Sequence, residues 1–444
     1  MHHNYLTMKI IKQILSLILL LNSVYLSAQK VVSISKEAVL LKVSEANTTL
    51  KISEEAFNEA RAEFRQTNAI FLPNITVSHT AMLTTNPLMA FGSKLNQEIL
   101  TPSDFNPILL NNPSQIENFA TRVELQQPLL NMDGLYHRKA AKNKMEAMSL
   151  QIQRTSEYLI FEVENTYMQL QLAYKGVEVL EKAYETALAN KTLADNNFKQ
   201  GYLQRADVLS VEVRVTEIQN QLQTAKSNVE NVSNYLSFLM NDEELTIYQP
   251  TDVLTLSGIH ETSLLNVSDN RSDIKAMTLT SDAYEAMYKA DKMQFLPRLN
   301  AFGSYELYDD HIFQGNANGY TFGAQLSWNL FEGSKRFGKT QQSKATFEKS
   351  KLQLEQYKSQ SHLEINKAKR MLLDAENKLE LSKLALDQSE ESLRIRTNRY
   401  KEGLEKTTDL LLSETQYAQK QLEYYQTIFE YNYAQAYLQF LTKA

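Results

Sequence analysis

Most of the chain follows a helical pattern of apolar and polar positions. Between residues 206 and 240, apolar side chains recur at alternating spacings of three and four residues, as in a coiled-coil seam. These positions are Val208, Val211, Val215, Ile218, Leu222, Ala225, Val229, Val232, Leu236 and Leu239. A second seam alternates large with small side chains at Ile365, Ala368, Leu372, Ala375, Leu379, Ser382, Leu386, Ser389 and Leu393. Large-small alternation lets neighbouring helices approach closely, so the pattern predicts helices packed into a continuous wall.

Two short interruptions divide the helical stretches into hairpins. Phe198-Lys-Gln-Gly201 interrupts the first stretch and Tyr400-Lys-Glu-Gly403 interrupts the second. We therefore predict helical hairpins over residues 135–240 and 334–441. A helix of roughly 60 residues is about 90 Å long, which suits a rod or a tube better than a soluble enzyme.

Between the helical stretches the pattern changes to alternation with a period of two. The clearest example places apolar side chains at Tyr320, Phe322, Ala324, Leu326, Trp328 and Leu330. We predict strands over about 72–92, 118–130, 297–309 and 319–331. Segments of about ten residues with one apolar and one polar face are typical of outer-membrane β-barrels. An antiparallel sheet packed on a soluble core would give the same alternation.

The two halves of the sequence repeat each other. Three motif pairs carry the repeat: Phe71-Leu-Pro73 with Phe295-Leu-Pro297, Phe198-Lys-Gln-Gly201 with Tyr400-Lys-Glu-Gly403, and Ala206-Asp-Val-Leu209 with Thr408-Asp-Leu-Leu411. We expect a first repeat over 29–240, a linker over 241–270 and a second repeat over 271–444. Each repeat contains a helix, a strand pair and a long coiled-coil helical hairpin. The predicted fold class is an α+β membrane protein built from two tandem repeats.

The N-terminal segment has the pattern of a signal peptide. Met8-Lys-Ile-Ile-Lys12 is basic, residues 14–21 are apolar, and Ser27-Ala28 supplies small residues for cleavage. We predict a signal peptide over residues 1–28, with a retained N-terminal anchor as the alternative and Met1 or Met8 as the start. No later stretch reaches 18 consecutive apolar residues, as a transmembrane helix requires.

Composition supports few and long elements. The chain of 444 residues has 12 Gly and 8 Pro, whereas an average composition would give about 53 of these residues together. The absence of Cys excludes disulfides, thiolate metal sites and a Cys-linked lipid anchor. A net charge of −6 argues against nucleic acid as the main partner.

No pattern of catalytic or cofactor-binding residues is present. The sequence has no phosphate-binding glycine loop, nucleophile elbow or metal-binding helix motif, and its histidines lack ligand spacing. We expect neither an enzyme nor a cofactor. The 13 methionines raise metal-specific export as an alternative, but Met82, Met89 and Met132 are widely spaced and methionine mostly fills gaps in cores.

The number of strands predicts self-association. Four strands cannot close a membrane barrel, and unpaired strand edges are forbidden in lipid. Three copies would supply twelve strands, which symmetry can close. On the predicted lumen face lie Arg122, Glu124 and Glu306, which either tune what passes or are simply solvated. Trp328, Tyr305 and Tyr320 would suit an aromatic girdle at the membrane boundary.

Over essentially the whole chain after the signal peptide, the sequence resembles the TolC-type outer-membrane efflux channel family. The resemblance is carried by Arg271-Ser-Asp-Ile-Lys-Ala276, Phe295-Leu-Pro297, Leu326-Ser-Trp-Asn-Leu-Phe-Glu-Gly333, and Arg399-Tyr-Lys-Glu-Gly403 followed by Asp409-Leu-Leu411. Ser272 stands where the family usually has proline, which is a minor departure.

The resemblance implies a homotrimer in the outer membrane with a large periplasmic portion. Its 12-stranded β-barrel would contact outer-membrane lipid and continue as a periplasmic α-helical barrel. Such channels are passive exit ducts for tripartite efflux or type I secretion. They work with a periplasmic adaptor (membrane fusion protein), which meets the hairpin tips, and with an inner-membrane pump. The substrate is therefore set by the pump.

The resemblance also implies a periplasmic gate at the hairpin tips. Tyr400, Gly403 and Asp409 match the family's tip positions, and three copies of Asp409 would form a ring of carboxylates. Asp409 could equally cap its helix, and the two roles are compatible. A second ring acid is replaced by Leu412 and a basic latch residue by Glu405.

The tip of the first hairpin carries the equivalent pair, Gly201 and Asp207. We expect both tip glycines, Gly201 and Gly403, to serve the geometry of the reversal. For Asp207 we expect helix capping or pairing between helices rather than a place in the lumen.

The rival hypothesis is a soluble periplasmic coiled-coil adaptor without channel activity. An adaptor normally has one hairpin flanked by small β-domains. The second hairpin weighs against this reading.

Overall fold

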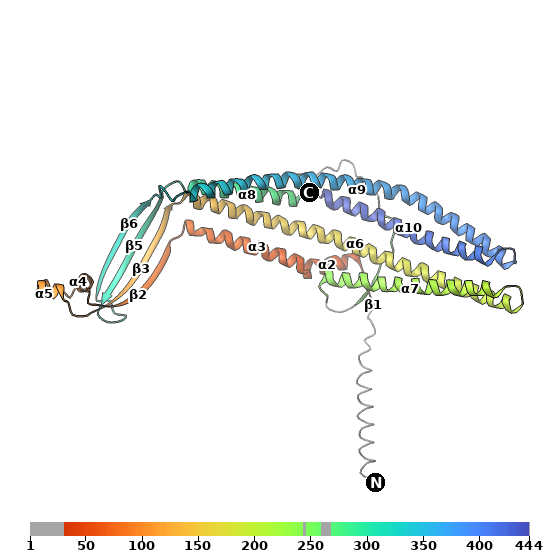
Figure 1. Ribbon diagram of the computed structural model, residues 1–444, viewed down its shortest axis with the longest axis horizontal. Helices are drawn as coiled ribbons and strands as arrows, with labels where there is room; N and C mark the ends of the chain where they lie inside the picture. The colour runs from red at the N-terminus through yellow and green to blue at the C-terminus, as the bar shows by residue number, and fades with distance from the viewer. Residues whose placement is uncertain (1–30, 243–245, 259–267, 444) are drawn as a thin grey trace, which may run out of the picture. The chain divides into compact units, whose positions relative to one another are not determined.

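The computed structural model describes residues 31–242, 246–258 and 268–443. The predicted signal peptide therefore lies outside the described residues. Two long helical hairpins and two strand pairs dominate the described chain (Figure 1), so the predicted fold class is confirmed. The hairpins consist of α6 (Met132–Lys199) with α7 (Arg205–Met240), and of α9 (Lys335–Lys401) with α10 (Thr407–Thr442).

By its contacts the chain divides into two compact units. One unit contains Ser53–Ile152 and Ser272–Tyr357, and we call it the strand unit. The other contains the described residues up to Ile52 together with those within Gln153–Arg271 and Lys358–Ala444, and we call it the hairpin unit.

The strand unit contains an antiparallel sheet of four strands. They are β2 (Asn74–Thr84), β3 (Ile116–Leu130), β5 (Arg298–Asp309) and β6 (Ala317–Ser327), in the order β2-β3-β5-β6. The central pair β3 and β5 joins the strands of the two sequence repeats, with Arg122 opposite Glu306. Strands β2 and β6 each pair on one side alone within the described chain. Two edges of the sheet are therefore available to other strands.

Small side chains pack the helices of the strand unit. These helices are α8 (Ser272–Met293), most of α3 (Thr48–Gln66) and the first parts of α6 and α9. Ala140 of α6 is buried with Ala283 and Ala286 of α8. The hydroxyl oxygens of Ser281 and Ser350 lie 3.0 Å apart between α8 and α9. Such small residues permit close approach of helix backbones.

The predicted strand over 72–92 is wrong beyond Thr84. Residues Pro87–Asn96 form helix α4, because Asn86 caps the helix through its side chain and Pro87 occupies its first turn. Proline lacks a backbone N–H for a ladder but fits the start of a helix. A short helix, α5 (Pro107–Asn111), follows in the same inter-strand segment.

The predicted strand over 319–331 also needs correction. Strand β6 ends at Ser327, which lies opposite Arg298, the first residue of β5. Pro297 precedes Arg298 and has no backbone N–H to donate, so the hydrogen-bond ladder between β5 and β6 ends here. Alternation in the sequence therefore continues past the last paired residue.

The hairpin unit has a small parallel sheet that the sequence analysis missed. Strand β1 (Val31–Ile34) pairs with β4 (Ile247–Pro250), which lies within the predicted linker 241–270. Helix α2 (Lys36–Ala46) follows β1. The core around them contains Ile34, Val39, Val43, Leu159, Val163, Tyr167, Leu170, Leu236, Leu239 and Tyr248. The Tyr167 hydroxyl donates to the carbonyl of Ile34 at 3.1 Å. Strands of four residues are too short to show periodicity.

Arg271, the first residue of a motif that carries the family resemblance, is an anchor of the hairpin unit. It is 2% exposed. Its guanidinium donates to the carbonyl of Leu441 in α10 at 2.9 Å and to the Ser361 hydroxyl in α9 at 2.7 Å. A planar guanidinium can hold two partners at once. Arg271 thus ties the end of α10 to α9.

Within the part of the chain that the structure describes, no helix is both long enough and apolar enough to cross a membrane.

Candidate functional site

The two hairpin tips have the same backbone geometry. Gly201 has a φ of +83° and Gly403 a φ of +71°. Tyr202 N donates to Asn197 O, and Leu404 N donates to Arg399 O, each at 2.9 Å. This six-to-one hydrogen bond with a left-handed glycine is the Schellman motif, which satisfies the last carbonyls of a helix. The glycines therefore serve the reversal of the chain.

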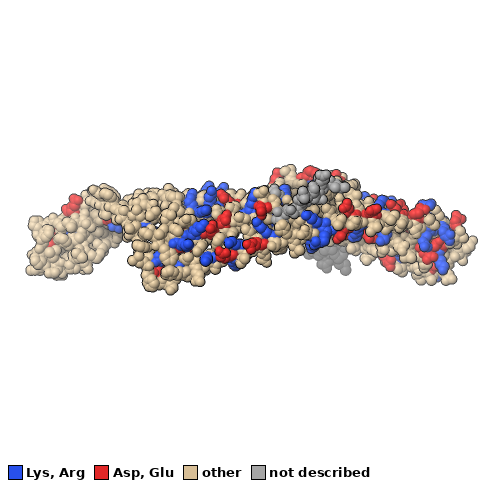
Figure 2. Space-filling view, turned by 90° about the horizontal axis from the view of Figure 1, so that it is seen from above, with Lys and Arg blue, Asp and Glu red and all other residues tan. Residues whose placement is uncertain are grey.

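A charged cluster holds the second tip. Glu405 accepts from Arg396 Nη1 at 2.8 Å and from Arg399 Nε at 2.8 Å. The hydrogen bond from Arg399 lowers the pKa of Glu405, the charge of Arg396 adds to this shift, and desolvation opposes it. Glu405 thus pairs with two arginines of its own chain at the place where the family pattern has a basic residue. The space-filling view shows acidic and basic side chains side by side at this end (Figure 2).

Tyr400 and Asp409 differ in their surroundings. Tyr400 is 7% exposed, and its hydroxyl lies 3.4 Å from the hydroxyl of Thr407. Asp409 lies in the first turn of α10 and is partly exposed. Its carboxylate has no hydrogen-bond or ion-pair partner among the described residues. No side chain caps α10 at Lys406. The structure therefore leaves the Asp409 carboxylate available at the tip.

Asp207, at the equivalent position of the first hairpin, takes part in a capping box. Its carboxylate accepts from Gln204 N at 3.3 Å at the start of α7. The two repeats therefore use this aspartate differently, although their sequences match here.

The polar face of the sheet carries the three residues predicted to face the lumen. Arg122 of β3 and Glu306 of β5 are direct neighbours, and Arg122 Nη2 lies 2.7 Å from Glu306 Oε1. Glu124 shares their face because side chains alternate along a strand, and it accepts from Gln126 at 2.9 Å. Arg122 and Glu306 thus neutralise each other within one chain.

The other face of the sheet is apolar and exposed in the single chain. Val77 is 67% exposed, Phe322 79% and Leu326 66%. Figure 2 shows few charged side chains over the strands. An exposed apolar face of this extent marks a surface that contacts protein or membrane.

Two of the three aromatic residues predicted for a girdle, Tyr305 and Tyr320, lie on this apolar side. Tyr305 and Tyr320 face each other across β5 and β6, and are 47% and 75% exposed. Trp328 directly follows β6 and donates from Nε1 to the carbonyl of Phe295 at 2.9 Å. Tyr320 and Trp328 are eight residues apart, which is about 26 Å along an extended chain and about 20 Å along the axis of a barrel whose strands tilt by about 40°. The apolar band of an outer-membrane barrel is about 25 Å tall.

A buried carboxylate in the hairpin unit was missed by the sequence analysis. Glu414 of α10 is 7% exposed and accepts a hydrogen bond from Asn190 of α6. Burial raises the pKa of Glu414 to about 7, although the charge of Arg214 in α7 and the hydrogen bond from Asn190 lower it. No sequence signal distinguishes this glutamate from the exposed acids around it.

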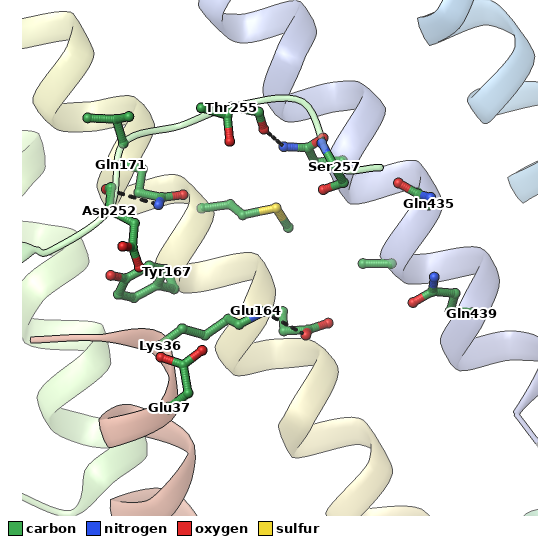
Figure 3. Close-up of a pocket in the computed structure, with 14 residues that line it drawn as sticks. Lys36, Glu37, Glu164, Tyr167, Gln171, Asp252, Thr255, Ser257, Gln435 and Gln439 are labelled. Atoms are coloured by element: carbon green, nitrogen blue, oxygen red, sulfur yellow. Dashed lines mark hydrogen bonds and ion pairs between the residues drawn. The ribbon is translucent and has the colours of Figure 1, made fainter. Parts of the chain in front are cut away.

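A polar pocket of about 370 Å³ also lies within the hairpin unit, between α2, α6, α10 and the segment after β4 (Figure 3). Gln171 donates to Asp252 O at 3.1 Å, and Lys36 pairs with Glu164 at 3.4 Å. Asn432 of α10 accepts from Ser257 N and donates to Thr255 O. These bonds attach the segment after β4 to α6 and α10, so we assign the lining a structural role.

The fold and these surfaces define a class of protein. The open-edged sheet with an apolar outer face and the two long hairpins are those of channel-forming outer-membrane proteins. Solved structures agree at the level of the fold. The outer membrane protein VceC from Vibrio cholerae has 16% identity and a TM-score of 0.79, over 92% of this chain and 96% of that one. The Campylobacter jejuni CmeC outer membrane channel has 17% identity and a TM-score of 0.78, over 92% and 85%.

A third solved structure, that of CusC, aligns with a TM-score of 0.80 at 14% identity, over 93% of this chain and 92% of that one. No curated protein matches the sequence. The family model of the outer membrane efflux proteins matches residues 40–242 and 265–442. The chain therefore belongs to the outer membrane efflux protein family, as the resemblance implied. It is a protein of the outer membrane, in a family of transport channels rather than enzymes.

Proposed function

We propose that three copies of this chain form a passive exit duct through the outer membrane. The observation that carries the proposal is the sheet, which has one exposed apolar face and two edges without partners in the described chain. In lipid, each edge must pair. Pairing β2 of one copy with β6 of the next would close a barrel of twelve strands by threefold symmetry.

The polar face of the sheet would then line the lumen. It carries Arg122, Glu124 and Glu306, and the ion pair between Arg122 and Glu306 would lower the net charge at that level. Val77, Phe322 and Leu326 on the opposite face would contact the acyl chains, with Trp328 at one boundary and Tyr305 and Tyr320 toward the other.

The hairpins would continue the duct into the periplasm and close it at their tips. Asp409 is partly exposed and without a partner within the described part of its own chain, so three copies around the axis would form a carboxylate ring that attracts cations. The basic latch residue that the family resemblance implies is replaced by Glu405, which pairs with Arg396 and Arg399 of the same chain. Closure would therefore depend on packing between copies more than on a latch.

The duct would take its energy and its substrates from partners. Among the described residues, no group of three or more His, Cys, Asp or Glu could hold a metal ion. We infer a periplasmic adaptor that meets the hairpin tips and an inner-membrane pump behind it. Tripartite efflux of small molecules and type I secretion of a protein both fit this duct.

Oligomeric state and membrane attachment test the proposal. We expect a trimer by native mass spectrometry, retention of the chain in membranes after carbonate extraction, and discrete current steps in planar bilayers. A monomeric chain that carbonate releases would refute the duct. It would instead support a soluble periplasmic adaptor.

A further inference from the structure

The inter-strand segment of residues 85–115 contains a surface that the duct does not explain. Helix α4 lies in this segment, next to the sheet end that Figure 1 shows away from the long helices of the strand unit. Ala90, Ser93 and Gln97, spaced three and four apart, are buried. The opposite side of the helix carries Leu88, 82% exposed, and Leu95, 56% exposed. Helix α4 therefore packs with its small residues and exposes its leucines.

Helix α4 is fixed to the polar face of the sheet. Gln97 Nε2 lies 2.8 Å from Glu117 O, 2.9 Å from the side-chain oxygen of Asn118 and 3.1 Å from Asp309 O. Asn118 lies on the same face as Arg122 because side chains alternate along β3. Helix α4 also contacts β6. The helix thus crosses the end of the sheet on the side that would line the lumen.

Burial along β2 supports the same placement. Met82, directly opposite Asn118, and Thr84 are partly covered, whereas Thr80 on the same face is exposed. Leu83, on the other face, remains 62% exposed. Covering at the strand end is therefore confined to the polar face.

The exposed side of this segment is apolar and almost uncharged. Leu88, Leu95, Ile99, Phe105, Ile108 and Leu109, each between 47% and 82% exposed, form what we call the apolar cap. Within residues 85–115 the charged residues are Lys94, Glu98 and Asp104, and Lys94 pairs with Asp104 at 2.7 Å. Helices that lie on a membrane surface are typically rich in Lys and Arg on their polar face. The composition therefore favours protein over lipid as the partner.

We propose that the apolar caps of three copies pack against one another and seal the barrel at the sheet end that carries α4. This inference rests on the trimer proposed above. A barrel of twelve strands, about 4.8 Å apart and tilted about 40°, is roughly 24 Å across. Three helices of about 10 Å diameter, each fixed to the lumen side, can span much of that opening. A hydrophobic constriction excludes water and ions until it is pushed apart.

Cysteine cross-linking tests the contact, because the natural chain has no Cys. In Leu88→Cys, we expect oxidation to join two of the three chains of each trimer, since each chain offers one thiol. Leu326→Cys is the matched control, because Leu326 is similarly exposed but lies on the apolar face. We expect no cross-link from this control.

Labelling from outside the cell tests the seal. Thr80→Cys places a thiol on the polar face, and a bulky, membrane-impermeant maleimide should reach it slowly. Leu88→Ser with Leu95→Ser should raise the labelling rate at least tenfold, whereas Leu326→Ser should not change it. This readout does not depend on the state of the hairpin tips.

The outcomes separate this inference from the proposed duct. A chain that is not trimeric by native mass spectrometry contradicts both. A trimer in which the Leu88→Cys variant does not cross-link and the double serine variant labels at the unchanged rate overturns the seal alone. A fluorophore attached to the thiol of the Leu88→Cys variant gives a further check. Its quenching by brominated lipid, without cross-linking, would likewise overturn the seal, because the cap would then contact the membrane.

Discussion

We predict that Glu414 makes the packing of α10 in the hairpin unit dependent on pH, because burial raises its pKa. Asn190 of α6 donates a hydrogen bond to it, and Lys182 of α6, Arg214 of α7 and Tyr417 of its own helix line a cavity of about 130 Å³ with it. Arg214 is itself 8% exposed, and its Nε atom has no hydrogen-bond partner among the described residues. Replacing Glu414 by Gln removes the titration and leaves the shape of the side chain.

The size of the effect follows from the pKa. The pKa of Glu414 rises from 4.5 to about 7, and desolvation is the main cause. One unit corresponds to 1.36 kcal/mol, so the shift is worth on the order of 3 kcal/mol. The folded state binds the proton more tightly than the opened state. Stability from this group is therefore fully present below pH 4.5 and is lost as the pH rises to about 7.

Hydrogen exchange of the α10 amides around Glu414 measures this stability locally. After correction for the intrinsic pH dependence of exchange, protection in the natural chain should fall by up to roughly 100-fold between about pH 4.5 and 7.5. Glu414→Gln should show no such fall. It should be about as protected as the natural chain at the acidic end of this range and better protected at the neutral end.

An exposed glutamate on the same helix supplies the control. Glu423 pairs with Lys420 at the surface, where its side chain is 44% exposed, so Glu423→Gln should retain the pH dependence of the natural chain. Equal pH slopes in the natural chain and in Glu414→Gln would refute the reasoning. They would mean that Arg214 compensates fully for the burial of the carboxylate.

Three further predictions concern the tips and the sheet. Gly403→Ala should destabilise its tip by about 1 kcal/mol, because the φ of Gly403 is +71°. Gly176→Ala should not destabilise its region, because Gly176 lies within a helix and has open space around it. Hydrogen exchange in the two regions measures both effects. Glu405→Gln should abolish the loss of tip protection that the natural chain shows as the pH falls through the lowered pKa of Glu405, measured by exchange at acidic pH. Arg122→Gln removes the positive partner of Glu306 on the polar face, so reversal potentials should show greater cation selectivity.

Much of the fold was predictable because its determinants are local. The seam positions of α7 and α9 are buried or partly buried throughout, as the alternation of threes and fours indicated. The tips were predictable because a left-handed residue at a helix end favours glycine, and Gly201 and Gly403 lie at positive φ. The strand faces followed from the period of two.

Other features depend on residues distant in the sequence. From the sequence, the residues of α4 were predicted to continue strand β2. The structure shows instead that Asn86 caps a helix here and that Gln97 at its end bonds to Asn118 of β3. Strands β1 and β4 are four residues each and pair across more than 200 residues. The match between Asp207 and Asp409 does not show that one caps its helix and the other does not.

The sequence by itself determined the two repeats, the long hairpins, the tip reversals and the two-faced strands, because propensity and periodicity act over neighbouring residues. Only the tertiary structure decided that β3 pairs with β5, which places Arg122 against Glu306. It alone placed α4 on the polar face of the sheet and enclosed Glu414 of α10 beside α6, α7 and α9. The physical reason is that register, burial and electrostatic environment depend on which distant segments contact each other. A local pattern of residues does not determine those contacts.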